Sequence, residues 1–171
     1  MNYRRLGRSG LRVSELCLGT MTFGSRFFNI ATVDQAAANR MVARAVEAGI
    51  NFFDTADVYS MGESEQTFGQ ALKSCGVPRE SAVVATKVFA PMSEAAANGE
   101  GDVNNAGLSR HHIMAACEAS LRRLGTGYID LSRFTPGTSW HRSKKRCVPS
   151  TTWCGRGRCA TWDAQTGPRV T

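Results

Sequence analysis

The feature of the sequence that most constrains its fold is an alternation of short apolar runs with longer amphipathic segments. The runs recur roughly every 30 to 45 residues, and the segments between them carry apolar residues at helical spacing. Such alternation predicts parallel strands joined by right-handed helical crossovers. The predicted strands lie at residues 15–21, 50–56, 81–88 and 128–131.

Two α/β architectures fit this alternation, a doubly wound sheet and a (β/α)8 barrel. No G-x-G-x-x-G follows the first predicted strand, which disfavours a dinucleotide-binding Rossmann unit. A barrel needs about 250 residues, so this chain of 171 residues would carry only its first half. Ahead of the first strand, residues 1–16 surround a Gly-Arg-Ser-Gly turn and predict a β-hairpin.

Start and stop signals place the helices. Thr32 and Gln35 predict a capping box for a helix that Gly49 ends, with an apolar face of Met41, Val42, Ala45 and Val46. A second helix is expected from Glu63 to Gly76, and residues 91–108 read as a polar loop.

The third expected helix starts after Ser109, its predicted N-cap, and stops at Gly125. It has one apolar stripe, made of Ile113, Ala116, Cys117, Leu121 and Leu124.

Polar side chains mark the carboxyl ends of three predicted strands, where parallel α/β folds carry their functional groups. The first strand ends in Gly19-Thr20-Met21, the second in Asp54 with Tyr59 five residues later, and the third in Lys87. Singly, an Asp is most often a turn or cap residue, a Tyr a packing residue and a Lys a solvated one. Three strand ends of one sheet meet at one edge, so we favour a common functional site.

An acid, a phenol and an amine at one site suit carbonyl reduction. A phenol, with a pKa near 10, is a poor acid at neutral pH, but a neighbouring ammonium favours the phenolate and eases proton donation. Tyr59 would donate a proton to the developing alkoxide, Lys87 would assist it, and Asp54 would hold Lys87 charged and in place. The hydride would come from a bound nicotinamide.

Four motifs, in this order, resemble the aldo-keto reductases: "RRLGRSGLRVSELCLGTMTFG", "NFFDTADVYS..GESE", "VVATKV" and "SLRRLGTGYIDL". The subgroup is similar to bacterial enzymes related to potassium-channel β subunits. The resemblance covers residues 1–131 and implies the first half of a (β/α)8 TIM barrel that follows an N-terminal hairpin. It also implies NADPH as cofactor and a small carbonyl compound as substrate.

By this resemblance Asp54, Tyr59 and Lys87 match three of the family's four catalytic residues. Gly19, Thr20 and Met21, together with Asp54, match cofactor-binding positions beside the nicotinamide. The fourth catalytic residue of the family is a His just after the fourth strand, where this chain has no His between Leu131 and Thr135. His111 and His112 precede that strand and do not match the motif.

The character of the sequence changes at Ser132. Residues 1–131 hold 13 Lys or Arg and 13 Asp or Glu, whereas residues 132–171 hold eight cations and one acid, so the tail carries the whole net charge of +7. All three tryptophans also lie in the tail, which shows no helical or strand periodicity. We therefore predict two regions, the half barrel at 1–131 and a disordered, non-native tail at 132–171.

A frameshift near Leu131 explains the tail. Read one base back, codons from Trp140 onward permit "APVEETLRALDDLVRAG", a helix-like string similar to the family's next helix. The codon pairs Trp140–His141, Trp153–Cys154 and Trp162–Asp163 force Ala, Val and Gly, and the Phe134–Thr135 junction reads His or Tyr. We expect the intact ancestor to be an active reductase and this chain to be truncated, unstable and inactive.

The tail and the chain also allow other interpretations. "RSKKRC" in the tail is typical of a nucleic-acid patch, and a zinc site would draw on His141, Cys147, Cys154 and Cys159. We expect neither a metal nor a nucleic-acid partner. The alternative function is a cofactor-sensing binding protein without catalysis.

The setting of the protein is expected to be the cytoplasm. No run approaches the roughly 18 apolar residues of a membrane span, and the start lacks the apolar stretch of a secretory signal. The cysteines Cys17, Cys75 and Cys117 have no paired spacing, as expected of thiols in a reducing compartment. The sequence leaves the oligomeric state open.

Overall fold

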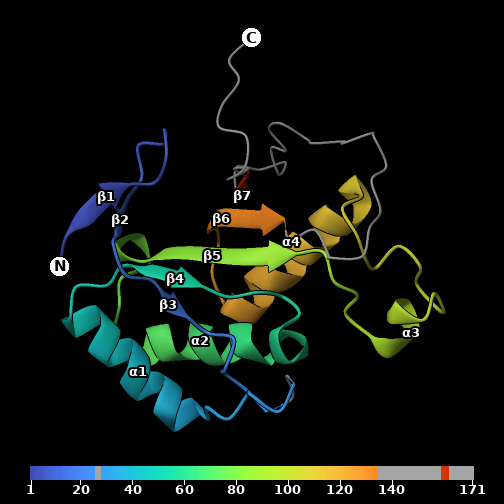
Figure 1. Ribbon diagram of the computed structural model, residues 1–171, viewed down its shortest axis with the longest axis horizontal. Coiled ribbons are helices and arrows are strands. Elements are labelled where there is room, and N and C mark those ends of the chain that lie inside the picture. Colours follow the sequence, from blue (N-terminus) through green and yellow to red (C-terminus); the bar gives the residue numbers. More distant parts are fainter. Residues whose placement is uncertain (26–27, 135–158, 162–171) are drawn as a thin grey trace.

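The fold is built on one parallel sheet in a computed structural model that describes residues 1–25, 28–134 and 159–161. Each strand pairs with the next in the chain, in the order β3-β4-β5-β6-β7 (Figure 1). A doubly wound sheet reverses its strand order, whereas a barrel adds strands in sequence. The described strands therefore follow barrel order. They are β3 (Leu18–Gly19), β4 (Phe52–Asp54), β5 (Val83–Val88), β6 (Ile129–Phe134) and β7 (Cys159–Thr161).

Helices cover one side of this sheet. Figure 1 shows α1 and α2 side by side along one flank, with α4 behind β5 and β6. Short helical turns η1 and η2 lie at either end of α2, and α3 lies in the loop after β5. The bounds are α1 (Gln35–Glu47), η1 (Tyr59–Gly62), α2 (Glu63–Ser74), η2 (Arg79–Ser81), α3 (Glu94–Ala97) and α4 (Arg110–Leu124).

The main core lies between the helices and the sheet. The rings of Phe53 and Phe68, on β4 and α2, are 5.2 Å apart and both fully buried. Apolar side chains of α1, β5 and α4 complete the same cluster, among them Val42, Val84 and Leu121. Burial of this surface, at about 25 cal/mol per Å², holds the helices on the strands.

Two details of α1 differ from the sequence-based expectation. Its N-cap is Asp34, whose side chain accepts a hydrogen bond from Ala37 N, so the predicted Thr32–Gln35 capping box is wrong. Met41 and Val46 are more than one-third exposed, and the buried face consists of Ala38, Val42 and Ala45. The buried face thus has three residues instead of the four predicted, and it includes Ala38, one helical turn before Val42.

The other helix signals are confirmed. Ser109 accepts from His112 N at the start of α4, all five residues of the predicted stripe are buried, and Gly125 ends the helix in the left-handed conformation. The loop at residues 91–108 contains the four-residue α3, capped by Ser93, which its polar composition did not predict.

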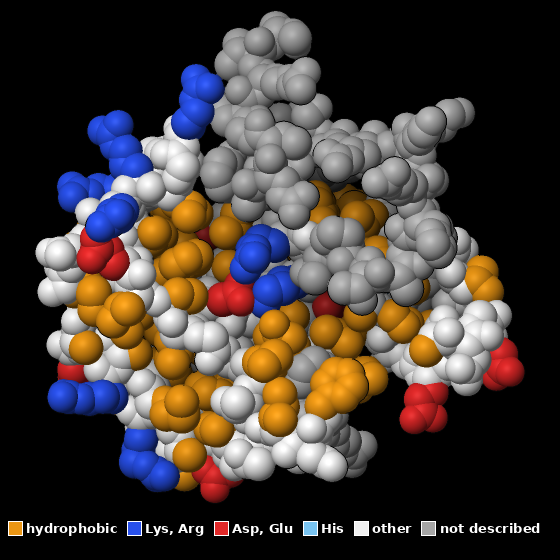
Figure 2. Space-filling model, in the orientation of Figure 1, with side chains coloured by type: hydrophobic (Ala, Val, Ile, Leu, Met, Phe, Trp, Pro, Cys, Tyr) orange, Lys and Arg blue, Asp and Glu red, His pale blue; other side chains and the backbone are white. Residues whose placement is uncertain are grey.

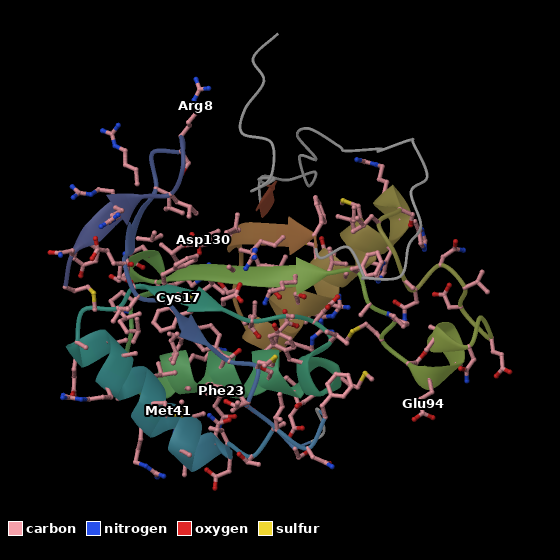
Figure 3. All side chains as sticks on the ribbon, viewed as in Figure 1. Arg8, Cys17, Phe23, Met41, Glu94 and Asp130 are labelled. Atoms are coloured by element: carbon pink, nitrogen blue, oxygen red, sulfur yellow. The ribbon has the colours of Figure 1, made fainter. Side chains whose placement is uncertain are left out.

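The N-terminal hairpin is confirmed as an antiparallel pair, β1 (Tyr3–Arg5) with β2 (Arg12–Ser14). It is tied to the segment before β4 by hydrogen bonds from Ser14 N to Asn51 Oδ1 (2.7 Å) and from Tyr3 Oη to Gly49 O (2.8 Å). Cationic side chains gather over the hairpin (Figure 2). Arg8 projects from its tip, away from the sheet (Figure 3).

The predicted boundary at residue 131 falls inside β6, which continues to Phe134 in register with β5. Beyond it, the structure describes only the backbone of β7, which pairs with β6 in parallel. The frameshifted string, the basic patch and the zinc set lie outside the described residues, apart from the backbone of Cys159. The frameshift and the two-region division remain predictions.

Candidate active site

The structure brings together the three predicted catalytic residues. The ammonium of Lys87 lies 2.6 Å from Asp54 Oδ2 and 2.9 Å from the phenol oxygen of Tyr59, donating to both. It also donates to the carbonyl oxygen of Thr55 (2.9 Å). Asp54 and Lys87 are largely buried, with 21% and 14% of their side chains exposed. An ammonium with three oxygen partners is fixed in position.

Strand register explains why these groups meet. Gly19, Asp54 and Ala85 are register neighbours across β3, β4 and β5, and Lys87 lies two residues further toward the carboxyl end of β5. Residues two apart in a strand point to the same face. The side chain of Lys87 therefore extends from β5 over the carboxyl end of β4, whose last residue is Asp54.

Tyr59 is placed by a strained turn between β4 and α2. Ser60, Met61 and Gly62 all have positive φ, at 50°, 53° and 90°. Such a conformation costs a non-glycine residue of order 1 kcal/mol or more and persists where the surroundings fix it. Ser60 is buried and donates to Phe23 O (3.2 Å), which holds the turn against the loop after β3.

Arg133 joins the site although the sequence did not indicate it. Its NH1 group lies 3.0 Å from Asp54 Oδ1, so Asp54 is shared between two cations. Arg133 is the register neighbour of Lys87 on β6. Recognising it from sequence would have required extending the fourth strand past residue 131, into the segment assigned to the tail.

The predicted cofactor residues lie at the same strand ends but differ in exposure. Gly19 is exposed, and a Cβ added there would meet nothing within 4 Å. The Thr20 side chain is fully buried and lies 2.9 Å from Ser64 Oγ, which itself donates to Thr20 O. Met21 is 41% exposed. The open surface of this stretch thus consists of the Gly19 backbone and the Met21 side chain.

A second cluster of ionisable groups lies beneath the site. Glu65 is fully buried and accepts from Thr86 Oγ1 and Arg123 Nε, both at 2.6 Å. Asp57, 1% exposed, has no hydrogen-bond partner for its Oδ2 among the described residues. Burial, and then the nearby charge of Glu65, raise the pKa of Asp57 to about 7. Sequence reasoning missed this acid, although it lies in the quoted "DTADVYS".

Cys17, labelled in Figure 3, precedes β3. Although the residue keeps exposed surface, partial burial of the thiol, and next the charge of Asp54, raise its pKa to about 11. The thiol is therefore protonated at neutral pH, and a protonated thiol is a poor nucleophile.

Neither histidine near α4 completes the site. His112 is buried in the first turn of the helix, where its Nδ1 lies 2.8 Å from Gly107 O. His111 is exposed. In the described part of the chain, neither is hydrogen-bonded to Asp54, Tyr59 or Lys87, in agreement with their mismatch to the motif.

A cavity of about 400 Å³ lies at the opposite end of the sheet, near the amino ends of β5 and β6. Arg79, which lines it, is engaged in structural contacts, since it pairs with Asp130 (2.6 Å) and stacks on Tyr128 (3.9 Å). The amino end of such a sheet serves stability rather than chemistry. The chemistry-bearing residues lie at the carboxyl end, outside this cavity.

The helices of the described residues are too short or too polar to span a bilayer. The same residues contain no group of three or more side chains placed to hold a metal ion.

Several known proteins are similar to this chain in sequence. The profile of the aldo/keto reductase family matches residues 15–141. Versiconal hemiacetal acetate reductase of Aspergillus parasiticus is 38% identical over 97% of this chain and 53% of its own length. A probable voltage-gated potassium channel subunit beta of Oryza sativa subsp. japonica is 41% identical over 77% of this chain and 36% of its own length.

The fold has a solved counterpart. The holo form of aldo-keto reductase AKR11C1 from Bacillus halodurans superposes with a TM-score of 0.61 and 37% identity, over 78% of this chain and 40% of that one. The described sheet and helices are thus part of a TIM barrel. The chain spans about half or less of the length of these relatives. It belongs to the aldo/keto reductase family.

Proposed function

We propose that the protein from which this chain derives reduces aldehydes or ketones to alcohols with NADPH. The observation that carries this proposal is the ammonium of Lys87, held within 2.9 Å of both the Asp54 carboxylate and the Tyr59 phenol. An ammonium at a phenol oxygen stabilises negative charge there, which makes the phenol a better proton donor to a carbonyl oxygen.

The residues at the carboxyl ends of β3 and β4 fit a nicotinamide cofactor. Gly19, the register neighbour of Asp54, leaves its backbone open, and Met21 offers an exposed apolar side chain two residues later. Buried Thr20 would support this stretch from below through Ser64 rather than contact the cofactor. When bound, the cofactor supplies a hydride to the carbonyl carbon.

The protein groups would handle the proton. Tyr59 gives its hydroxyl proton to the carbonyl oxygen, and the resulting phenolate stays beside the Lys87 ammonium. Asp54 and Thr55 O hold the Lys87 ammonium in place beside the phenol. The reduced carbonyl becomes an alcohol, and Tyr59 recovers a proton from solvent.

We also propose that the chain in the given reading frame does not turn over substrate. The family's His is missing from the positions after Leu131. In addition, Arg133 forms an ion pair with Asp54 and competes with Lys87 for this carboxylate. Sequencing the DNA from the Tyr128 codon onward tests the origin of this segment. One corrected base that restores a helix–strand series supports the frameshift, and a confirmed frame with no barrel sequence following in any frame contradicts it.

The enzymatic proposal is tested by single turnover of a carbonyl substrate with NADPH, using the frame-corrected protein and the chain as given. We expect turnover only in the former, with Tyr59→Phe reducing it by about 10²–10⁴-fold. Tyr128→Phe is the matched control, because Tyr128 lies at the opposite end of the sheet against Arg79. Equal loss in both variants, or full activity of Tyr59→Phe, would contradict the assignment.

The second candidate is a cofactor-sensing binding protein, favoured by the similarity to a potassium channel subunit beta. Titration with NADPH separates the two functions: tight binding without turnover in the frame-corrected protein favours the binding role. Cys17 and Cys75 are free thiols. This agrees with the cytoplasmic location that we propose for either function.

A further inference from the structure

The buried acid beneath the active site has a place in the chain that the catalytic assignment does not use. Asp57 lies between the end of β4 and Tyr59, two residues before the phenol. Its backbone N–H donates to Lys87 O (3.3 Å), and Thr55 N donates to Ala85 O (2.9 Å). The segment leading to Tyr59 is therefore attached to β5, the strand that carries Lys87.

Charged groups of three elements face the Asp57 carboxyl. Glu65 of α2 repels a negative charge there, while Arg123 of α4 and Lys87 of β5 attract it. Arg123 is already committed to Glu65 and Ser120, and Lys87 to Asp54 and Tyr59. The backbone N–H of Val58 and these two cations favour the charged carboxylate, but burial and the charge of Glu65 outweigh them and favour the neutral acid.

The turn that follows stores strain. Ser60 and Met61 are held in the left-handed region directly after Tyr59. The segment on its amino side, Thr55 to Asp57, is almost completely buried. A charge on Asp57 would need water, and outward movement of this strained turn supplies it while relaxing the backbone.

We propose that Asp57 is a positioning residue whose neutral carboxyl group keeps the Tyr59 turn docked on the end of β5, and that ionisation of this carboxyl releases the turn. The alignment of Tyr59 with Lys87 then depends on the proton of a residue that touches neither substrate nor cofactor. This inference rests on the proposed role of Tyr59. The experiment that tests it measures amide hydrogen exchange rather than turnover. Its outcome can therefore contradict this inference without contradicting the proposed function, and the reverse also holds.

The test is amide hydrogen exchange of the full chain from about pH 5.5 to about pH 8.5, corrected for the intrinsic pH dependence of exchange. We expect protection of residues 55–62 to fall by about tenfold while residues 110–124 of α4 keep theirs. Asp57→Asn, nearly isosteric and unable to ionise, should remove this fall. Asp102→Asn, at an exposed loop acid, should behave as wild type.

Three results would overturn the proposal: constant protection of residues 55–62, an equal loss in α4, or the same fall in Asp57→Asn. Titration of the carboxyl carbon of Asp57 in ¹³C-labelled wild-type protein gives a second decision that needs no variant. A midpoint near 7 supports the inference. A midpoint below about 5, in the range of ordinary acids, refutes it even where the variant does not fold.

Discussion

At the scale of single residues, the site depends on one cation with several partners. Lys87 joins the carboxylate of Asp54, the phenol of Tyr59 and the carbonyl of Thr55. Removing one member of a largely buried ion pair leaves the other without compensation, and that loss exceeds the net value of the pair itself. Arg133 offsets part of it, because it holds the other oxygen of Asp54.

Lys87→Met should therefore lower the free energy of unfolding by about 2–4 kcal/mol. Urea unfolding followed by circular dichroism measures the change. Lys73→Met is the matched control on the exposed end of α2 and should cost less than about 1 kcal/mol. A cost for Lys87→Met no larger than the control's would mean that the ion pair is not formed in solution.

At the scale of secondary-structure elements, capping residues determine where a helix begins, but two nearby residues can both be candidates for the N-cap position. Thr32 and Asp34 both precede α1, and both residue types cap helices. The chain turns into the helix at Gln35, so only the Asp34 side chain reaches a free backbone N–H, that of Ala37 at 2.7 Å.

Asp34→Ala should destabilise the protein by about 1 kcal/mol, because Ala37 N loses its acceptor. Thr32→Ala, at an exposed residue outside the cap, should change stability by less than about 0.5 kcal/mol. Paired thermal melts of the two variants decide between the two caps, and a reversed order of effects would restore the capping box.

The close contact between α2 and α4 depends on a glycine, Gly69, which has no side chain. Gly69 of α2 faces the end of α4 so closely that an added Cβ would lie 2.8 Å from the carbonyl carbon of Leu124. Real Cβ atoms do not approach backbone this closely, so the two helices would have to separate.

Gly69→Ala should destabilise the protein by about 1–3 kcal/mol, despite the gain in helix propensity that Ala brings in an open helix. Gly10→Ala, with open space around its Cβ, should stay within about 0.5 kcal/mol of wild type. Denaturant midpoints provide the comparison. A stabilised Gly69→Ala protein would show that α2 and α4 do not touch at this point.

At the scale of the whole molecule, the buried acid makes stability depend on pH. The pKa of Asp57 is about 7 in the folded protein, above its ordinary value of 3.8. Between these values the folded state binds more protons than the unfolded state, so the unfolding free energy falls as pH rises. The loss accumulates from about pH 4 to about pH 7 and then levels off.

Asp57→Asn should remove this contribution, so its stability relative to wild type should rise by on the order of 4 kcal/mol across that range. Chemical unfolding of both proteins at several pH values measures the difference between their unfolding free energies. The contributions of all other titrating groups cancel in this difference, because both proteins contain them. A constant difference at all pH values would show that Asp57 titrates normally.

The sequence by itself determined the alternation of elements, the hairpin, the glycine stops and the grouping of Asp54 and Lys87 at strand ends with Tyr59 five residues after Asp54. These depend on local spacing and on the rule that parallel strands end at one edge, which a single chain displays directly. The family followed from four short motifs for the same reason.

Only the tertiary structure decided what happens between elements. In the folded chain Thr20 is buried against Ser64, and the buried face of α1 consists of Ala38, Val42 and Ala45. Arg133 pairs with Asp54, and Asp57 is enclosed near Glu65. Each depends on strand register and on loss of water around groups far apart in the chain. Register and desolvation are properties of packed neighbours, and for that reason no local sequence pattern contains them.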